Sequence, residues 1–308
     1  MTTTPVDSLA AGAAVPASQS LTSTVSPRRR LVDGVFRAAL VASILIALLT
    51  LAVLLIDTFV TGQPRINGAL IENMPSARPA RAGIQSAIWG TLWVVGTAAL
   101  VSLPLGVGTA VYLEEFAPQG RWYIRLIELN IQNLAGVPSV VFGILGLAFI
   151  ARGALGWGFT VGSAAMVLTI LVLPVVIIAS REAIRAVPPS LREGSLALGA
   201  TRWQTVWRQI LPSAIPGIAT GSILSVSRAA GETAPLLLLG ALTFVTYNPD
   251  GLDSGYTVLP MLIFRYSSDA KDEFQVVAAA AIIVLLGMLL AMNTAAILVR
   301  NHFQKRRN

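Results

Sequence analysis

The chain contains no cysteine, and only 12% of its residues are charged. The absence of cysteine excludes disulfides, thiol catalysis and cysteine-ligated metals. The one histidine, His302, lies in a charged tail, so we expect neither a metal site nor histidine-based proton transfer. Soluble domains carry about 25% charged residues, whereas 55% of this chain is hydrophobic. The composition therefore indicates an integral membrane protein.

Lysine is also scarce, since the chain has only Lys271 and Lys305. Neither lies in a G-x-x-x-x-G-K-[ST] sequence, so the chain cannot form a phosphate-binding P-loop. Energy from a nucleotide would have to come from another subunit, and we expect no cofactor in this chain. The net charge of +7 does not predict a nucleic-acid partner, because the positions of the charges are more informative than their sum.

Long apolar segments dominate the sequence. Spanning a bilayer takes about 20 apolar residues, and six segments qualify: 38–56, 84–113, 129–150, 159–180, 214–245 and 276–299. Each must be a helix, because a lone strand leaves its backbone unpaired in lipid. Residues 1–27, rich in Ala, Ser, Thr and Pro, indicate a disordered tail. We predict an all-α polytopic membrane protein with one transmembrane domain at 28–308.

Arginine and lysine are distributed unevenly between the two sides. With the N-terminus in the cytoplasm, fifteen of the 22 fall on the cytoplasmic side, six outside, and Arg228 lies within a span. Cytoplasmic loops carry such an excess, so both termini are predicted to lie in the cytoplasm. The last outer loop, 246–275, contains a short apolar piece that we expect to lie at the membrane interface.

The cytoplasmic segment 190–212 is too charged to cross a bilayer and carries helix signals. Pro188-Pro189 stops the preceding helix. Ser190 and Glu193 have the spacing of a capping box that would begin a new helix. Gly199 is placed to end that helix in a left-handed conformation.

A second short helix follows. Thr201-x-x-Gln204 offers another capping box, and an apolar face is expected from four residues at i, i+3, i+4 and i+7, which are Trp203, Val206, Trp207 and Ile210. Pro212 is expected to end the helix. Helices this short are marginal in water, so the two should need a partner surface. The alternative is a hairpin lying on lipid headgroups, anchored by Trp203 and Trp207.

Arg228 and Glu232 lie inside the span 214–245, where ionisable groups are costly and mark function. Their i, i+4 spacing permits pairing, and Pro235 crowds the carbonyl of Gly231 and should break the helix. A broken helix is tolerated where it lines a cavity. Arginine suits oxyanions, and Glu232 could hold the charge neutral until an anion arrives. The alternatives are a loop joining two shorter spans and a structural ion pair.

Two motifs resemble known families. E-G-S-x-x-x-G at 193–199, followed by Q-I-L-P at 209–212, resembles the coupling loop of ABC importer permeases, E-A-A-x-x-x-G-x9-I-x-L-P; Gln209 departs from it. In that family the loop docks in a cleft of an ATP-hydrolysing subunit. The expected docking residues are Ser190, Glu193, Gly199, Trp203, Leu211 and Pro212.

R-A-A-G-E-T-A-P-L-L at 228–237 and N-L-A-G-V-P-S-V-V-F-G at 133–143 resemble the A-type (PstA) permeases of phosphate-specific ABC importers. The resemblance covers about 84–300 and implies a type I permease core of five helices in a bacterial or archaeal plasma membrane. It implies as partners a PstC-type permease, two PstB-type subunits that bind ATP and Mg, and an extracytoplasmic PstS-type phosphate-binding protein. The expected path residues are Asn133, Ser139, Arg228, Gly231, Glu232 and Thr233.

Other functions stay open at this point. The chain could be a permease for another oxyanion, such as sulfate or molybdate. Polar residues in spans, such as Asn133, Ser139 and Thr233, also commonly form helix–helix hydrogen bonds. A secondary transporter would usually show inverted repeats, which the sequence lacks. A membrane enzyme could use Glu114-Glu115, but Phe-Ala-Pro follows this pair and indicates an ordinary loop turn.

Overall fold

The computed structural model describes residues 27–118, 120–240 and 244–305, which form helices and no strand. The chain divides into two compact units, Met1–Leu55 and Ile56–Asn308. The predicted disordered tail, 1–27, lies outside the described residues except for Pro27, which begins α1 (Pro27–Gly62).

Within the first unit, α1 is exposed along its whole described length from Arg28 to Leu55. Its exposed residues are mostly large and apolar from Leu40 onward. A helix that is apolar on all sides requires lipid or protein around it. This matches the span predicted at 38–56.

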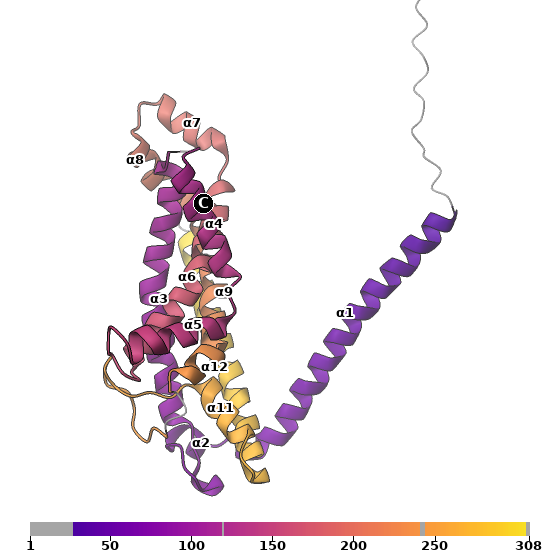
Figure 1. Ribbon diagram of the computed structural model, residues 1–308. Helices are drawn as coiled ribbons and strands as arrows, with labels where there is room; N and C mark the ends of the chain where they lie inside the picture. Colours follow the sequence, from indigo (N-terminus) through magenta and orange to yellow (C-terminus); the bar gives the residue numbers. More distant parts are fainter. Residues whose placement is uncertain (1–26, 119, 241–243, 306–308) are drawn as a thin grey trace, which may run out of the picture. The chain divides into compact units, whose positions relative to one another are not determined.

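The second unit is a bundle of helices (Figure 1). In chain order they are η1 (Gln63–Arg65), α2 (Gly68–Glu72), η2 (Pro79–Arg81), α3 (Gln85–Val111), η3 (Tyr112–Phe116), α4 (Trp122–Ala135), α5 (Ser139–Leu145), η4 (Gly146–Ala151), α6 (Val161–Arg185), α7 (Pro189–Ala197), α8 (Arg202–Thr205), η5 (Val206–Ile210), α9 (Leu211–Gly231), α10 (Ala234–Leu238), α11 (Leu259–Ser267) and α12 (Asp272–Lys305). The elements η3, η4 and η5 are π-turns that widen the helices they adjoin.

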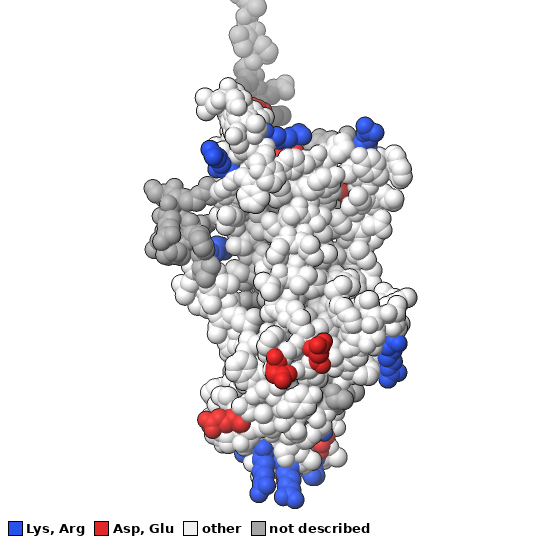
Figure 2. All heavy atoms as spheres, turned by 90° about the vertical axis from the view of Figure 1, so that its left-hand side faces the viewer, with Lys and Arg blue, Asp and Glu red and all other residues white. Residues whose placement is uncertain are grey.

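Five helical stretches of the described residues are long and apolar enough to span a membrane, and a sixth is broken. The broken one comprises α4 and α5–η4, which meet at 103° across the residues 136–138. It corresponds to the predicted span 129–150, so the six-span prediction holds when this bent pair counts as one span. On the face in Figure 2, Lys and Arg gather toward the two ends, and the zone between them is largely uncharged.

The helix α6 lies at the centre of the bundle, packed against α3 on one side and α9 on another. The main core cluster joins α6 to its neighbours through fully or nearly fully buried side chains, including Val94, Phe142, Leu168 and Leu236. Because lipid tails are as apolar as these residues, close packing rather than escape from water holds such helices together.

The short helix α11 contains the apolar piece of the last outer loop, which was predicted to lie at the membrane interface. Its residues Leu259, Leu262 and Tyr266 are buried against α3 and α12. The Tyr266 hydroxyl donates to the carbonyl oxygen of Gly83 at 3.0 Å. These residues recur at i, i+3 and i+7 and form one buried helical face, which the sequence prediction did not include; the interfacial depth of this helix stays a prediction.

Candidate functional site

The helices α7 and α8 form a small lobe, which we call the knob, at one end of the bundle (Figure 1). The predicted capping box of Ser190 and Glu193 is not formed. The helix α7 begins two residues earlier than predicted, at Pro189, and Pro188 rather than Ser190 is its N-cap. Proline at the first helical position needs no partner for its missing amide. This places Ser190 inside the first turn, where its side chain caps nothing.

The turn between the two knob helices agrees with the prediction. Gly199 has φ of +84°, in the left-handed region that favours glycine. The predicted second capping box is also confirmed: the Thr201 amide donates to Gln204 Oε1 at 2.9 Å, and the Gln204 amide donates to Thr201 Oγ1 at 3.3 Å. Local signals therefore determine the shape of the knob.

One prediction about the second knob helix was wrong. Pro212 does not end the helix, which runs without interruption from 202 to 231. The π-turn η5, which ends at Ile210, shifts the hydrogen-bond pattern just before the proline, which has no amide to donate. On the predicted apolar face, Val206 and Ile210 are buried, whereas Trp203 and Trp207 are 60% and 50% exposed and pack against each other with ring centroids 5.4 Å apart.

The outer surface of the knob carries an exposed apolar side chain and a carboxylate that has no partner among the described residues. Leu198 is 90% exposed, and exposed Glu193 has no ion-pair or hydrogen-bond partner among the described residues. A hollow of about 430 Å³ lies beside them, lined by Ser190, Leu191, Gly194, Ser195, Leu198, Ala200, Gln204, Arg208 and Gln209. Gln209, the departure from the family pattern, thus faces the same hollow as the docking residue Ser190, whereas Leu211 and Pro212 belong to α9.

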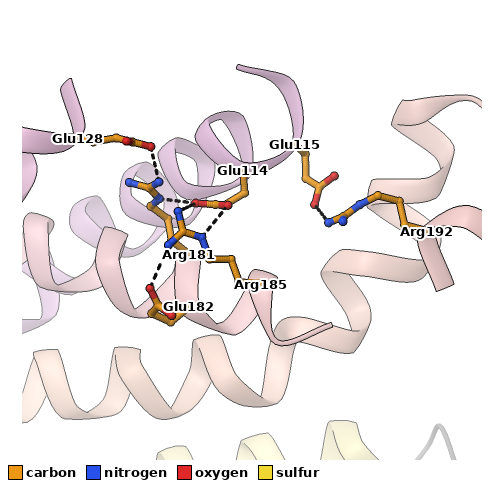
Figure 3. A network of polar contacts seen from close by, with 7 residues as sticks. All are labelled: Glu114, Glu115, Glu128, Arg181, Glu182, Arg185 and Arg192. Carbon is orange, nitrogen blue, oxygen red and sulfur yellow. Dashed lines mark hydrogen bonds and ion pairs between the residues drawn. The ribbon is translucent and has the colours of Figure 1, made fainter. Parts of the chain in front are cut away.

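A network of ion pairs lies where the knob joins the bundle (Figure 3). Arg181 of α6, whose side chain is 8% exposed, donates to Glu114 and to Glu128 at 2.5 Å each. Arg185 donates to Glu114 through its Nε at 3.0 Å. Two carboxylates thus share two guanidiniums, and these charges tie η3, α4 and α6 together.

The same π-turn connects to the knob. Glu115, whose side chain is 4% exposed, accepts a hydrogen bond from Arg192 of α7. The Glu114-Glu115 pair was therefore misread as an ordinary loop turn. A usable signal was present, because Arg181 and Arg185 stand one helical turn apart at the end of another span on the same predicted side.

The predicted break near Arg228 is present. The helix α9 ends at Gly231, Glu232 has an extended backbone (φ −71°, ψ 123°), and α10 begins at Ala234. Arg228 Nε lies 3.4 Å from Glu232 Oε1. The arginine side chain is 57% exposed and the glutamate side chain 14% exposed, so the guanidinium is accessible while its partner is largely covered. Thr233 Oγ1 donates weakly to the Gly231 carbonyl at 3.4 Å.

The two motifs with phosphate-permease resemblance pack against each other. The helix α5, from the first motif, contacts α10, from the second. A Cβ atom on Gly143 would lie 2.7 Å from the Cα of Pro235, so only glycine permits this approach. Asn133 is exposed near the end of α4 and Ser139 is half-buried at the start of α5. Neither bonds to Arg228 among the described residues, so the structure joins the motifs by backbone packing rather than by these polar side chains.

Comparison with known proteins supplies the family. The profile of the family described as "Binding-protein-dependent transport system inner membrane component" matches residues 102–304. The chain is 36% identical over 243 residues to the "Probable ABC transporter permease protein YqgI" of Bacillus subtilis, covering 77% of this chain and 78% of that one. It is 34% identical over 284 residues to the "Phosphate transport system permease protein PstA 1" of Mycobacterium tuberculosis H37Rv, covering 91% of each.

Solved structures agree at the level of the fold. A bacterial alginate ABC transporter chain superposes with a TM-score of 0.64 at 19% identity, covering 89% of this chain and 95% of that chain. A chain of the MetNI methionine ABC transporter gives 0.59 at 17% identity, covering 70% and 94%. The all-α fold is that of the type I ABC importer permeases. The chain therefore belongs to the binding-protein-dependent transport system inner membrane component family, as a multi-pass membrane permease of the PstA kind.

Proposed function

We propose that this chain is a membrane permease subunit of an ATP-driven importer of inorganic phosphate, and that the Arg228–Glu232 pair handles the anion. The observation that carries the proposal is the half-exposed guanidinium of Arg228 at the break between α9 and α10. Arginine recognises tetrahedral oxyanions through two parallel hydrogen bonds. Relatives that are named phosphate transport permeases and align with 91% of this chain support phosphate as the anion.

The geometry of the pair suits reversible binding. At 3.4 Å the Arg228–Glu232 contact is long, and the arginine is largely open to its surroundings. Glu232 neutralises the guanidinium while no anion is bound, which lowers the energy of leaving a charge at membrane depth. An arriving phosphate would displace this weak contact and leave the glutamate on the covered side of the break.

Energy is proposed to come from a separate pair of PstB-type subunits, which bind ATP and Mg. The knob offers them exposed Leu198, the unpaired carboxylate of Glu193 and the neighbouring hollow. A PstC-type permease and an extracytoplasmic PstS-type phosphate-binding protein complete the proposed assembly. The knob end would then face the cytoplasm, together with both termini, in agreement with the arginine bias of the sequence.

The test uses the assembled transporter in cells or proteoliposomes, with labelled phosphate uptake as the readout. Arg228→Ala removes charge-assisted hydrogen bonds, each about 1.5–3 kcal/mol, so we expect uptake to fall at least about tenfold while the subunits still co-purify. Glu232→Gln, which removes the neutralising charge, should slow release and turnover with less effect on binding. The matched control is Arg78→Ala, because Arg78 is exposed and its side chain makes no hydrogen bond or ion pair among the described residues.

Two results would contradict the proposal. Normal uptake by Arg228→Ala would remove this residue from the path. Sulfate uptake that equals phosphate uptake in the unmodified assembly would instead leave the path intact but reject phosphate as the specific cargo.

A further inference from the structure

A second basic site lies away from Arg228, between η3, the first turns of α4 and the knob end of α6. It is a cleft of about 400 Å³ lined by Leu113, Glu114, Ala117, Gly120, Arg121, Ile124, Arg125, Glu128, Arg181 and Arg185. Its lining holds four arginines and two glutamates, which leaves an excess of two positive charges. A cleft lined by an excess of one sign concentrates counter-ions.

The excess charge belongs to two identifiable residues. Arg181 and Arg185 are paired with Glu114 and Glu128 (Figure 3). Arg121 and Arg125 are exposed and have no ion-pair partner among the residues that the structure describes. Arg121 is the N-cap of α4 and Arg125 follows one turn later, so both positive charges stand near a helix N-terminus, where the helix dipole disfavours them. An anion between them would offset this unfavourable interaction.

The start of α4, next to these two arginines, also has the residue composition of a membrane–water boundary. Trp122 and Tyr123 are 76% and 38% exposed at its start, and Leu126, Ile127 and Leu129 are exposed further along. Tryptophan and tyrosine mark the headgroup level of a bilayer. The first turn of α4 has no acidic residue and no side-chain cap, so its amides add to the attraction for an anion. The basic cleft thus opens at headgroup level, above an apolar surface suited to acyl chains.

We propose that Arg121 and Arg125 bind the phosphate group of an anionic glycerophospholipid from the leaflet at the knob end. The cleft provides the charge, the aromatic residues set the depth, and the apolar side chains of α4 contact the acyl chains. Basic clefts between transmembrane helices bind lipid headgroups in this way. The bound lipid would hold α4 against the ion-pair network that connects to the knob. This inference rests on the membrane-spanning fold and is independent of the transported anion.

The test is a lipid titration of the purified transporter assembly followed by native mass spectrometry. The probes are phosphatidylglycerol, phosphatidylcholine and inorganic phosphate. Two arginines near a charged headgroup contribute about 1 kcal/mol each. We therefore expect Arg121→Gln/Arg125→Gln to weaken phosphatidylglycerol binding roughly 25-fold, at tenfold per 1.4 kcal/mol. Arg121→Lys/Arg125→Lys keeps the charges and should retain most of the binding, which separates loss of the site from misfolding.

The control is Arg78→Gln/Arg81→Gln, a pair of exposed arginines on the loop before α3, which should leave the affinity unchanged. The proposal is overturned if phosphatidylcholine binds as tightly as phosphatidylglycerol, or if the glutamine pair has no effect. Loss of binding in the control would show a bulk charge effect and also overturn it. Displacement of the lipid by inorganic phosphate alone would assign the cleft to a free anion. Binding to the isolated chain but not to the assembly would mean that a partner subunit covers the cleft, and it would also overturn the proposal.

Discussion

The attachment of α7 to the bundle depends on one buried carboxylate. No residue of α7 is buried, so packing contributes little to its position. Its side-chain links among the described residues are the Arg192–Glu115 ion pair and a 3.0 Å hydroxyl contact between Ser195 and Thr205 of α8. The ion pair is the link that reaches η3 at the end of α3, and it should therefore control how often α7 opens away from the bundle.

The magnitude follows from the exposure of the two partners. Removing one partner of a fully buried pair costs about 3–5 kcal/mol, because the other charge is left buried. Glu115 is 4% exposed but Arg192 is 38% exposed, so water can reach the carboxylate once the arginine is shortened. We therefore expect Arg192→Gln to reduce the free energy of opening α7 by about 1–3 kcal/mol. Glu115→Gln/Arg192→Gln should be less damaging than Arg192→Gln alone, since no buried charge remains.

The assay is hydrogen–deuterium exchange of the peptide that covers 193–200, in the permease without its ATPase. Its amides are protected by hydrogen bonds such as Leu198 to Gly194 at 3.2 Å. A loss of about 2 kcal/mol speeds exchange about 30-fold. Arg202→Gln on α8 is the control, because Arg202 is exposed and unpaired among the described side chains. Unchanged exchange in Arg192→Gln, or a double variant as fast as the single one, would refute the reasoning.

Two further substitutions test backbone geometry. Gly199→Ala should weaken co-purification with the ATPase, because an L-residue in the left-handed region costs about 1–2 kcal/mol, while a Cβ at this position meets no neighbour. Gly199→Asn should restore part of the co-purification. Equal binding of the ATPase by the unmodified protein and both variants would contradict a role for this turn. Gly143→Ala should lower the stability of the fold by about 1–3 kcal/mol through overpacking against the Pro235 backbone. Gly136→Ala is the control and should have no such effect, because its Cβ would lie at an ordinary 3.5 Å from the Asn133 carbonyl oxygen. An unchanged melting temperature in Gly143→Ala would reject the close approach of α5 and α10.

The features that sequence reasoning predicted correctly are those governed by neighbouring residues. The left-handed Gly199, the Thr201–Gln204 box and the break after Gly231 each depend on at most five consecutive positions. The features that sequence reasoning missed depend on residues that are far apart in the sequence. Glu114 and Arg181 are 67 residues apart, and Glu115 and Arg192 are 77 apart. Pairings over such separations depend on which helix ends the fold brings together. The spacing of Arg181 and Arg185 marks one side of such a pairing but does not identify the carboxylates on the other side.

The continuation of the helix past Pro212 has a mechanical consequence, because it joins the knob directly to the proposed anion site. A helix ending at Pro212 would leave the knob free to pivot on its own. The observed helix runs through 30 residues from Arg202 to Gly231, about 45 Å at 1.5 Å per residue. Its first residues belong to the knob, and its last turn carries Arg228. A displacement imposed on α8 must therefore bend this helix or move its far end. Since Val206, Ile210 and Ala214 are buried against α3 and α6 along the way, bending is opposed by packing, and we expect the movement to reach Arg228.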